Sequence, residues 1–474
     1  FVLANELGDT DETRDSCDAH CTLAEALAEV QRCDVPPGVR LVENASYTLT
    51  NSTWSRTGST VASRDAREAM DARDWGYVGL PRIYAKDVRI HGNGATIRRD
   101  PDSAYGFRFF HVQPGASLSI GNLTLSGGRP PYDRNAGIER HGGAVLNEGE
   151  LWAGEVDFTD NLGINKGGAI FNKGVFYMTL GAATGNRIRS GTSVGGGGFL
   201  YNDAGAIAYL DRATLRDNDS GAVHGGAVFN KGLLDAWGVT FDGNESQYNG
   251  GALYVGGDED SPSVTRLDRC TLSNNVASEG GAIDMHGAVD MTVARSTISG
   301  NAAGRIGAIS VISGRLALED VTVYGNASES RYYGASLYLS GTSAEVSVFN
   351  TIIAGGTGGL GECGFGSGSA LAETASSFDS DGSCGVARSG DPMLAALGDN
   401  GGPTFTHAPR YRSPVLDVGT AVHDRDQRGH KRAGVGDADI GAYVRPCSVR
   451  FCIDIDDFDP IVPIDPFDPG IPLF

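Results

Sequence analysis

The chain has 474 residues and a formal net charge of −21, with 69 glycines and 40% hydrophobic residues. Glycine is about twice as frequent as its usual ~7% share, yet the apolar content suffices for a core, which excludes wholesale disorder. The acidic balance disfavours nucleic acid and anionic membranes as partners. The sequence contains no apolar stretch of about 20 residues, so we expect no membrane span.

The first predicted element is a helix over residues 22–31. Four apolar residues recur at helical spacing on one face: Leu23, Ala26, Leu27 and Val30. Such a helix suits the open end of a larger core, so we expect residues 1–40 to form an N-terminal segment with a capping helix. The chain begins with Phe1 rather than Met, as expected after removal of a signal peptide. We therefore expect a secreted, extracellular protein at the cell surface.

An internal repeat dominates residues 41–400. Its corner consists of Gly-Gly-Ala, an aliphatic residue, a large residue and often Asn. The copies begin at Gly142, Gly167, Gly197, Gly225, Gly250, Gly280, Ile306 and Tyr333. Between the corners, short strands of β-branched or aromatic residues lead to a second series of asparagines: Asn161, Asn218, Asn244, Asn275, Asn301 and Asn326. Each period thus contains at least two strands separated by turns, which makes one coil.

This repeat predicts an all-β fold, a right-handed parallel β-helix of roughly ten coils. Paired glycines permit a positive φ at a sharp corner and leave room where coils pass about 4.8 Å apart. Asparagines in register can hydrogen-bond from coil to coil. We expect the β-helix over residues 41–400, with an insertion around 51–86, and its C-terminal part and cap over 401–446.

The fifth corner position gives a candidate binding surface. In five successive coils it holds Leu146, Phe171, Tyr201, Phe229 and Tyr254. Strand alternation places it opposite the inward fourth position, so these residues would form an apolar stripe ~20 Å long at ~4.8 Å per coil. Two interpretations stay open. Either a loop or the N-terminal segment covers the stripe, or the stripe binds a sugar polymer, a neighbouring copy's tail or another helix.

Eight cysteines, gathered mostly near the two ends of the chain, indicate an oxidising compartment. We expect disulfides between Cys363 and Cys384 and between Cys447 and Cys452. The pairing of three others stays open: Cys17, Cys21 and Cys33. Cys270 occupies a slot that holds small apolar residues in other coils, so we expect a buried free thiol that packs as a hydrophobe.

Three parts of the chain carry a family resemblance. The corners resemble the repeats of polymorphic outer membrane proteins and of pectin-lyase-like β-helices. Residues 17–26 (Cys-Asp-Ala-His-Cys-Thr-Leu-Ala-Glu-Ala) resemble the CSLREA signature of exported β-helix proteins, with Thr22 for its Ser and Ala24 for its Arg. Four stretches are similar to the choice-of-anchor Q domain: residues 377–385, 401–404, 426–429 and 439–443. The resemblance implies a β-helix and export, and implies little about activity.

Residues 447–474 form a Pro- and Asp-rich tail beyond the family-like region. Its closely spaced prolines favour an extended or polyproline II conformation. The apolar residues between them are unusual for a solvated linker: Phe458, Ile461, Val462, Ile464, Phe467 and Ile471. Two interpretations stay open. The tail folds back along its own helix, or it adds as a strand to a neighbouring copy and so forms a homopolymer.

The sequence shows no catalytic constellation, and we assign no catalytic residue and no cofactor. Its nine histidines are scattered, and the acidic sequence blocks of inverting pectin hydrolases do not occur in the coils. Calcium is the one candidate ion. Asp379 with Asp381, and Asp437 with Asp439, are spaced like fragments of oxygen-ligand loops.

Three functions follow, in order of preference. The first is a structural extracellular protein that assembles into a surface filament or layer through its terminal segments, with other copies of itself as partners. The second is a monomeric cell-surface adhesin or glycan-binding β-helix that uses the apolar stripe. A polysaccharide lyase comes third, because a net charge of −21 opposes the cationic groove that a polyuronate needs.

Overall fold

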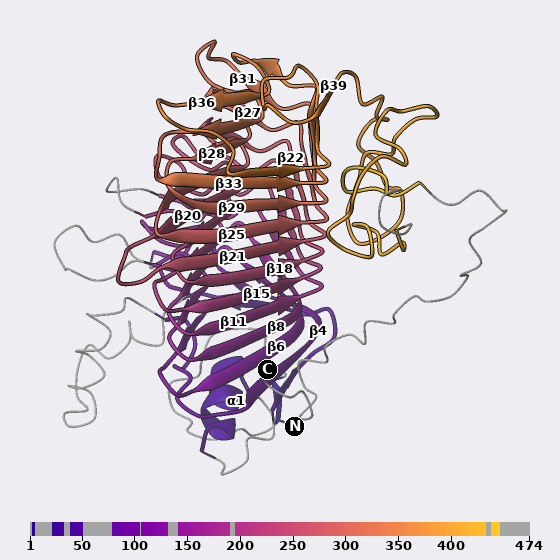
Figure 1. Ribbon diagram of the computed structural model, residues 1–474. Coiled ribbons are helices and arrows are strands. Elements are labelled where there is room, and N and C mark those ends of the chain that lie inside the picture. The colour runs from indigo at the N-terminus through magenta and orange to yellow at the C-terminus, as the bar shows by residue number, and fades with distance from the viewer. Residues whose placement is uncertain are drawn as a thin grey trace. The chain divides into compact units, whose positions relative to one another are not determined.

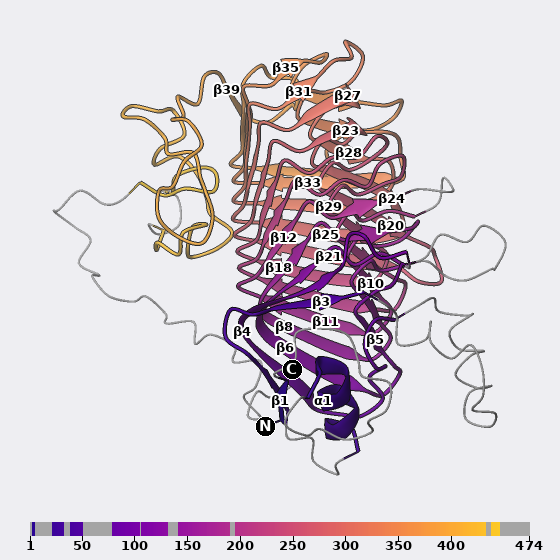
Figure 2. The ribbon, with the colours of Figure 1, turned by 180° about the vertical axis from the view of Figure 1, so that it is seen from behind.

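The computed structural model describes residues 2–4, 21–32, 38–50, 78–104, 106–130, 141–189, 195–432 and 438–445. It is a parallel β-solenoid of about ten coils, which confirms the expected all-β fold (Figures 1 and 2). The described chain divides into two compact units. The first contains the residues up to Tyr209 with Ala213–Gly232, and the second contains Leu210–Arg212 and the residues from Leu233 onward.

Three series of strands recur in the coils and are called here sheets 1, 2 and 3. In the first unit, sheet 1 contains β1 (Val2–Ala4), β2 (Val39–Leu41), β3 (Ser46–Leu49), β4 (Val88–Arg99), β6 (Ser117–Ser126), β8 (Glu150–Thr159), β11 (Val175–Thr179), β12 (Ala182–Thr184), the start of β15 (Ile207–Asp211) and β16 (Thr214–Arg216). Sheet 2 contains β5 (Phe110–Val112), β7 (Val145–Asn147), β10 (Ile170–Asn172), β14 (Leu200–Asn202) and β17 (Val228–Asn230), and sheet 3 contains β9 (Leu162–Gly163) and β13 (Arg187–Ile188).

The second unit continues the same order of strands in each coil. Sheet 1 contains β18 (Leu233–Trp237), β19 (Thr240–Asp242), β21 (Ser263–Asp268), β22 (Thr271–Ser273), β25 (Val289–Ala294), β26 (Thr297–Ser299), β29 (Gly314–Glu319), β30 (Thr322–Tyr324), β33 (Ala344–Phe349), β34 (Ile352–Ala354), β37 (Glu373–Ala375), β38 (Phe378–Asp379) and β39 (Arg388–Ser389). Sheet 2 contains β20 (Leu253–Gly257), β24 (Ile283–Gly287), β28 (Ile309–Val311), β32 (Leu337–Leu339) and β36 (Cys363–Phe365), and sheet 3 contains β23 (Val276–Glu279), β27 (Ala302–Ile306), β31 (Ala327–Ser328) and β35 (Thr357–Gly358).

The corner glycines act as the repeat predicts. Gly167 has a φ of +64°, a value that side chains with a Cβ rarely adopt. At Gly168 a Cβ would collide with the backbone carbonyl of Gly198 in the next coil. The aliphatic residue that follows each corner, such as Ile170 or Leu200, is fully buried and registers with its equivalent in the neighbouring coil. The corner therefore sets both the turn and the inward side of the strand.

Asparagine ladders connect the coils inside both units, as expected. In the first unit Asn172 Nδ2 donates to Asn202 Oδ1 over 2.8 Å, and Asn186 Nδ2 donates to Asn218 Oδ1 over 2.9 Å. In the second unit Asn275 Nδ2 donates to Asn301 Oδ1 over 2.9 Å. These side chains are fully buried and also bond backbone groups. The ladders therefore satisfy the polar backbone groups of the turns where water is excluded.

Helix α1 (Leu23–Val30) packs against β1 and β2, the first strands of the first unit. Its start explains part of the signature-like stretch at residues 17–26. Thr22 accepts a hydrogen bond from the Glu25 backbone, while Glu25 Oε2 accepts from Thr22 N over 2.7 Å, which is a capping box. Its apolar face is buried as predicted. Among the described residues no helix combines the length and the apolar content that crossing a membrane requires.

A turn at residues 379–384 covers β36, the last strand of sheet 2. Asp381 Oδ2 accepts a hydrogen bond from Glu362 N, and Ser383 Oγ accepts one from Cys363 N, both over 3.0 Å. A disulfide joins Cys363 to Cys384, which confirms that predicted pairing. Two backbone donors at this edge are thus occupied, which hinders pairing with a further strand.

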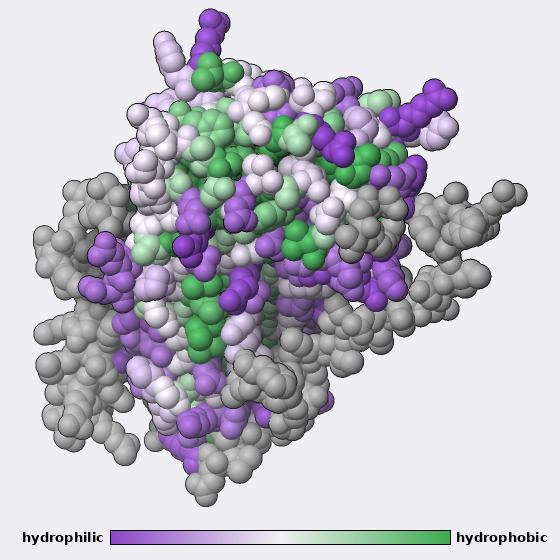
Figure 3. Space-filling model, in the orientation of Figure 1, coloured by the Kyte–Doolittle hydropathy of each residue, from purple (hydrophilic) through white to green (hydrophobic). Residues whose placement is uncertain are grey.

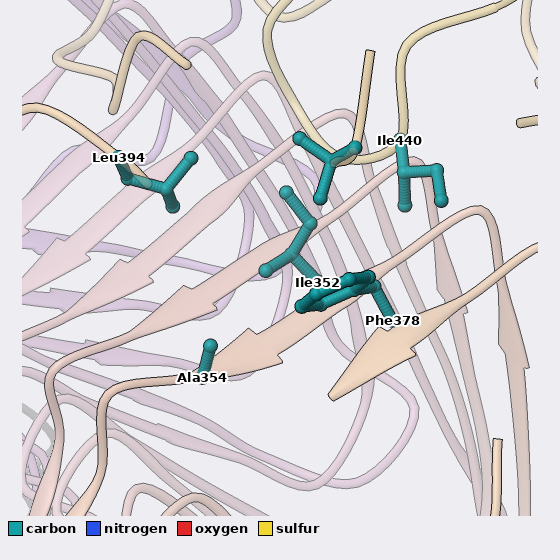
Figure 4. Packing of buried hydrophobic residues seen from close by; sticks show 6 residues of the cluster. Ile352, Ala354, Phe378, Leu394 and Ile440 are labelled. Atoms are coloured by element: carbon teal, nitrogen blue, oxygen red, sulfur yellow. The ribbon is translucent and has the colours of Figure 1, made fainter. Parts of the chain in front are cut away.

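The segment from Asp391 to Arg445 runs beside the coils of its own unit (Figure 1). Leu394, Val415 and Ile440 pack on Ile352, Ala354 and Phe378 of β34 and β38 (Figure 4). Gln427 accepts a hydrogen bond from Thr297 and donates one to Thr404. Gln427 and Ile440 thus hold this segment to sheet 1.

Candidate functional site

Four residues of the predicted stripe lie in the first unit and are buried. Leu146, Phe171, Tyr201 and Phe229 expose between 1% and 7% of their surfaces. They follow one another in register along sheet 2, and the rings of Tyr201 and Phe229 stack with centroids 4.7 Å apart. These four residues therefore form a covered row and not an exposed stripe.

Among the described residues, two side chains that directly precede corners lie against the row. Lys166 Nζ lies 5.2 Å from the ring centroid of Phe171 and 4.7 Å from that of Tyr201. His141 meets Phe171 edge to face, with centroids 4.8 Å apart. Burial lowers the pKa of His141 to about 3, so its imidazole is neutral at pH 7. The row is thus a lateral extension of the core.

The fifth stripe residue, Tyr254, lies in the second unit and begins a row of a different kind. Along β20, β24, β28 and β32 the registered residues are Tyr254, Asp284, Ser310 and Tyr338. We call these four residues the Tyr-Asp-Ser-Tyr row. Two large aromatic residues stand at its ends and two small polar residues between them, on coils ~4.8 Å apart.

Asp284 is the centre of this row and is fully buried. Its Oδ2 lies 2.6 Å from His286 Nε2 and accepts a hydrogen bond from Asn249 Nδ2 over 3.1 Å. Its Oδ1 has no hydrogen-bond partner within the described part of the chain, and the same holds for the fully buried Oγ of Ser310. Since buried polar atoms are nearly always paired, two such atoms at successive positions mark an incomplete site.

Burial and charge set the protonation of the groups around Asp284. Burial alone would lower the pKa of His286, but the hydrogen bond and charge of Asp284 raise it above its usual value. The pKa of Tyr254 is also raised, first by burial and then by the charges of Asp284 and Asp258. The His286 ring stacks on Tyr254 with centroids 5.4 Å apart. Asp284 therefore holds a partly exposed imidazole in a fixed orientation.

A second polar group flanks the row from sheet 3. Glu279 ends β23 and forms an ion pair with Arg305 of β27, whose guanidinium also donates to Tyr333 Oη over 3.0 Å. Tyr333 meets Tyr338 edge to face with centroids 4.9 Å apart. Figure 2 shows β23 and β27 above β24 and β28 on this side of the molecule. We call Tyr254, Tyr333 and Tyr338 the tyrosine face. Through the hydrogen bond from Arg305 to Tyr333, this face contacts charged side chains.

Solvent reaches this face, in contrast to the covered row of the first unit. Tyr254, Tyr333 and Tyr338 are all partly exposed, and the adjacent Tyr332 is 83% exposed. The sequence shows that Asp284 and Ser310 interrupt the stripe, but it does not show their neighbours. Glu279, Arg305 and Tyr333 come from other strands, and no spacing in the chain links them to the corner pattern.

A further aromatic series lies on sheet 1 of the first unit. Trp152 stacks on Tyr177 with centroids 3.7 Å apart, and Tyr177 on Tyr209 with centroids 4.8 Å apart. Strand alternation alone places all three opposite buried neighbours such as Phe176, so this series was predictable. The facing surfaces of the stacked rings are covered, and all three side chains are partly exposed. Figure 3 shows apolar and hydrophilic side chains mixed on the side where the strands of sheet 1 lie in front in Figure 1.

The calcium candidates act as hydrogen-bond acceptors for turns. Asp379 accepts from Gly382 N and Cys384 N, and Asp381 accepts from Glu362 N. Asp439 accepts from Asp417 N over 2.9 Å. Asp437 lies outside the described residues. Within the described ranges no group of three or more His, Cys, Asp or Glu side chains is arranged to hold a metal ion.

The remaining predicted residues divide into two sets. Cys270 is a buried free thiol, as expected, and burial raises its pKa strongly, so it is protonated and unreactive. Cys21 is disulfide-bonded. Other predicted positions lie outside the described residues: Cys17, Cys33, Cys447, Cys452 and all of the tail, with Phe458, Ile461, Val462, Ile464, Phe467 and Ile471.

Comparison with family models, curated proteins and solved structures finds no match to this chain. The assignment of the parallel β-solenoid therefore rests on the geometry of the coils. Any assignment of function rests on the residues of the site.

Proposed function

We propose that this chain is an extracellular, monomeric β-solenoid that binds carbohydrate through the tyrosine face of its second unit. The observation that carries the proposal is the Tyr-Asp-Ser-Tyr row, where partly exposed tyrosines lie beside a buried carboxylate and an ion pair. Sugar sites combine aromatic surfaces for the apolar side of a ring with fixed polar groups for its hydroxyls. This is the second of the functions drawn from the sequence.

The closed edges of the coils favour a monomer over stacking of coils end to end. Helix α1 packs on the first strands of its unit, and the disulfide-linked turn at residues 379–384 covers β36 in the other. A solenoid with covered terminal strands does not grow by strand pairing at those edges. Assembly into a filament would therefore require the tail at residues 447–474, and it stays a prediction.

Export rests on two supporting observations. The disulfide between Cys363 and Cys384 is typical of proteins from oxidising compartments. The resemblance to CSLREA and choice-of-anchor Q proteins, which are exported, points the same way. A lyase is not proposed, because a net charge of −21 opposes the cationic groove that a polyuronate needs.

A glycan array probed with the full chain tests the proposal. We expect binding to at least one polysaccharide class and a loss of roughly tenfold or more in affinity for Tyr333→Ala, as for an aromatic residue central to an interface. Tyr411→Ala is the matched control, because Tyr411 is 79% exposed and belongs to the segment from Asp391 to Arg445. Failure of the full chain to bind any glycan, or equal binding by the Tyr333 variant, would contradict the proposal.

A further inference from the structure

The anionic groups of an acidic ligand do not match the hydrogen-bonding needs of the two unpaired atoms in the Tyr-Asp-Ser-Tyr row. A carboxylate oxygen only accepts hydrogen bonds, and a serine hydroxyl donates one and accepts others. Asp284 Oδ1 and Ser310 Oγ lie on neighbouring coils at paired positions, and neither has a partner among the residues that the structure describes. The missing group must therefore be a donor to Asp284. The carboxylate of a uronate, a sulfate and a phosphate offer only acceptors and cannot fill this position.

An ammonium group satisfies this site better than a neutral hydroxyl does. A hydrogen bond between ionised partners is about twice as strong as a neutral one, and an ammonium that displaces His286 keeps the buried carboxylate paired with a positive charge. Tyrosine rings stand at both ends of the row, and aromatic faces attract cations. The net charge of −21 raises the local concentration of cations around the whole protein.

We propose that the Tyr-Asp-Ser-Tyr row binds the protonated amino group of an amino-sugar unit, with Asp284 Oδ1 and Ser310 Oγ as its partners. This inference rests on the proposed carbohydrate binding and names its ligand class. The sugar ring packs on the tyrosine face, and the amino group enters the row between Tyr254 and Tyr338. One unit of an amino-sugar polymer is thereby distinguished from neutral and acidic sugars.

His286 controls access to the carboxylate. Its imidazole contacts Asp284 Oδ2 and its side chain is 35% exposed, whereas Asp284 is fully buried, so in this proposal the ring must turn aside before a ligand reaches the carboxylate. The groups that face His286 are Asp284 and Asn249, with the charge of Glu279 nearby and the ring of Tyr254 stacked on it. Protonated His286 already neutralises Asp284 and competes with an incoming ammonium. Removing His286 therefore strengthens binding, whereas removing the Asp284 charge weakens it.

Calorimetric titration of the full chain at pH 6 tests this assignment with four probes: hexamers of glucosamine, N-acetylglucosamine, glucose and galacturonate. We expect the glucosamine hexamer to bind at least tenfold more tightly than its N-acetylated form, from the value of one charge-assisted hydrogen bond. Asp284→Asn abolishes this preference, Ser310→Ala weakens binding roughly threefold to tenfold, and His286→Ala strengthens it. Asp290→Asn, an exposed carboxylate on β25, is the matched charge control and leaves binding unchanged.

The opposite signs of the Asp284 and His286 variants separate ligand binding from a purely structural role, in which both would weaken binding. Ser310→Ala and His286→Ala keep the test decisive if Asp284→Asn unfolds. Equal affinity for the glucosamine and N-acetylglucosamine hexamers would overturn the amino-sugar assignment and leave carbohydrate binding in place. A lysine homopolymer is titrated as a fifth probe; its preference over every sugar would overturn the assignment too, and would assign the row to a protein amine.

Discussion

Replacement of Asn301 by Ala tests the energetic role of the asparagine ladder. Asn301 is fully buried in the second unit. Its Oδ1 accepts hydrogen bonds from Asn275 N and Asn275 Nδ2, both over 2.9 Å. Its Nδ2 donates to Leu272 O and to Asn326 Oδ1, both over 3.0 Å. The alanine variant leaves two buried groups, Asn275 N and Leu272 O, without this partner, because Asn326 Oδ1 keeps the bond from Asn301 N and Asn275 Nδ2 keeps its bond to Phe241 O.

Each buried polar group that loses its partner costs about 1–3 kcal/mol, and entry of water into the space offsets part of the sum. We therefore expect Asn301→Ala to lower the free energy of unfolding by about 2–5 kcal/mol. Urea unfolding followed by circular dichroism measures the change. Asp290→Ala on the exposed side of β25 is the control and should stay within about 0.5 kcal/mol. A loss below about 1 kcal/mol for Asn301→Ala, the net value of one ordinary hydrogen bond, would refute the reasoning.

Three further predictions concern other parts of the chain. Replacing Cys363 and Cys384 together by Ala should cost about 3 kcal/mol, from the closed loop of 21 residues between them, and denaturant unfolding without reductant measures it. Because the pKa of His141 falls to about 3 on folding from its unfolded value of about 6.5, stability is complete above pH 6.5 and declines as the pH falls toward 3. The wild type should therefore lose about 2–3 kcal/mol more than His141→Phe between pH 6.5 and 4.5, and equal losses would contradict this. If terminal segments join subunits, deletion of residues 447–474 should replace filaments by folded monomers, as seen by electron microscopy. Unchanged filaments would show that the tail does not connect the subunits.

Much of the fold was predictable because its rules are local. The Gly-Gly corners need a positive φ and the close passage of backbone, and both demands act within a few residues. The asparagines recur at the period of the coil, so their alignment follows from the repeat itself. The disulfide between Cys363 and Cys384 follows from two cysteines left near each other late in the repeat.

The site was predictable only in part, because its neighbours come from separate elements. The sequence places Tyr254 and Asp284 in register, and it also shows where the aromatic pattern stops. It does not reveal that Lys166 covers Phe171 and Tyr201, since the cover depends on how corner side chains fold over the sheet. The position of Gln427, which bonds Thr271 and Thr297 more than 100 residues earlier in the chain, is equally nonlocal.

Hydrogen–deuterium exchange of the full chain with and without a saturating glycan, identified from the array, tests the central claim most directly. The account predicts slower exchange in peptides that cover β20, β24, β28 and β32 with the adjoining β23 and β27. Peptides that contain the covered row of the first unit, with Phe171 and Tyr201, should exchange equally in both states. Protection confined to the first unit, or absent from β24 and β28 at saturation, would contradict the assignment of ligand binding to the Tyr-Asp-Ser-Tyr row.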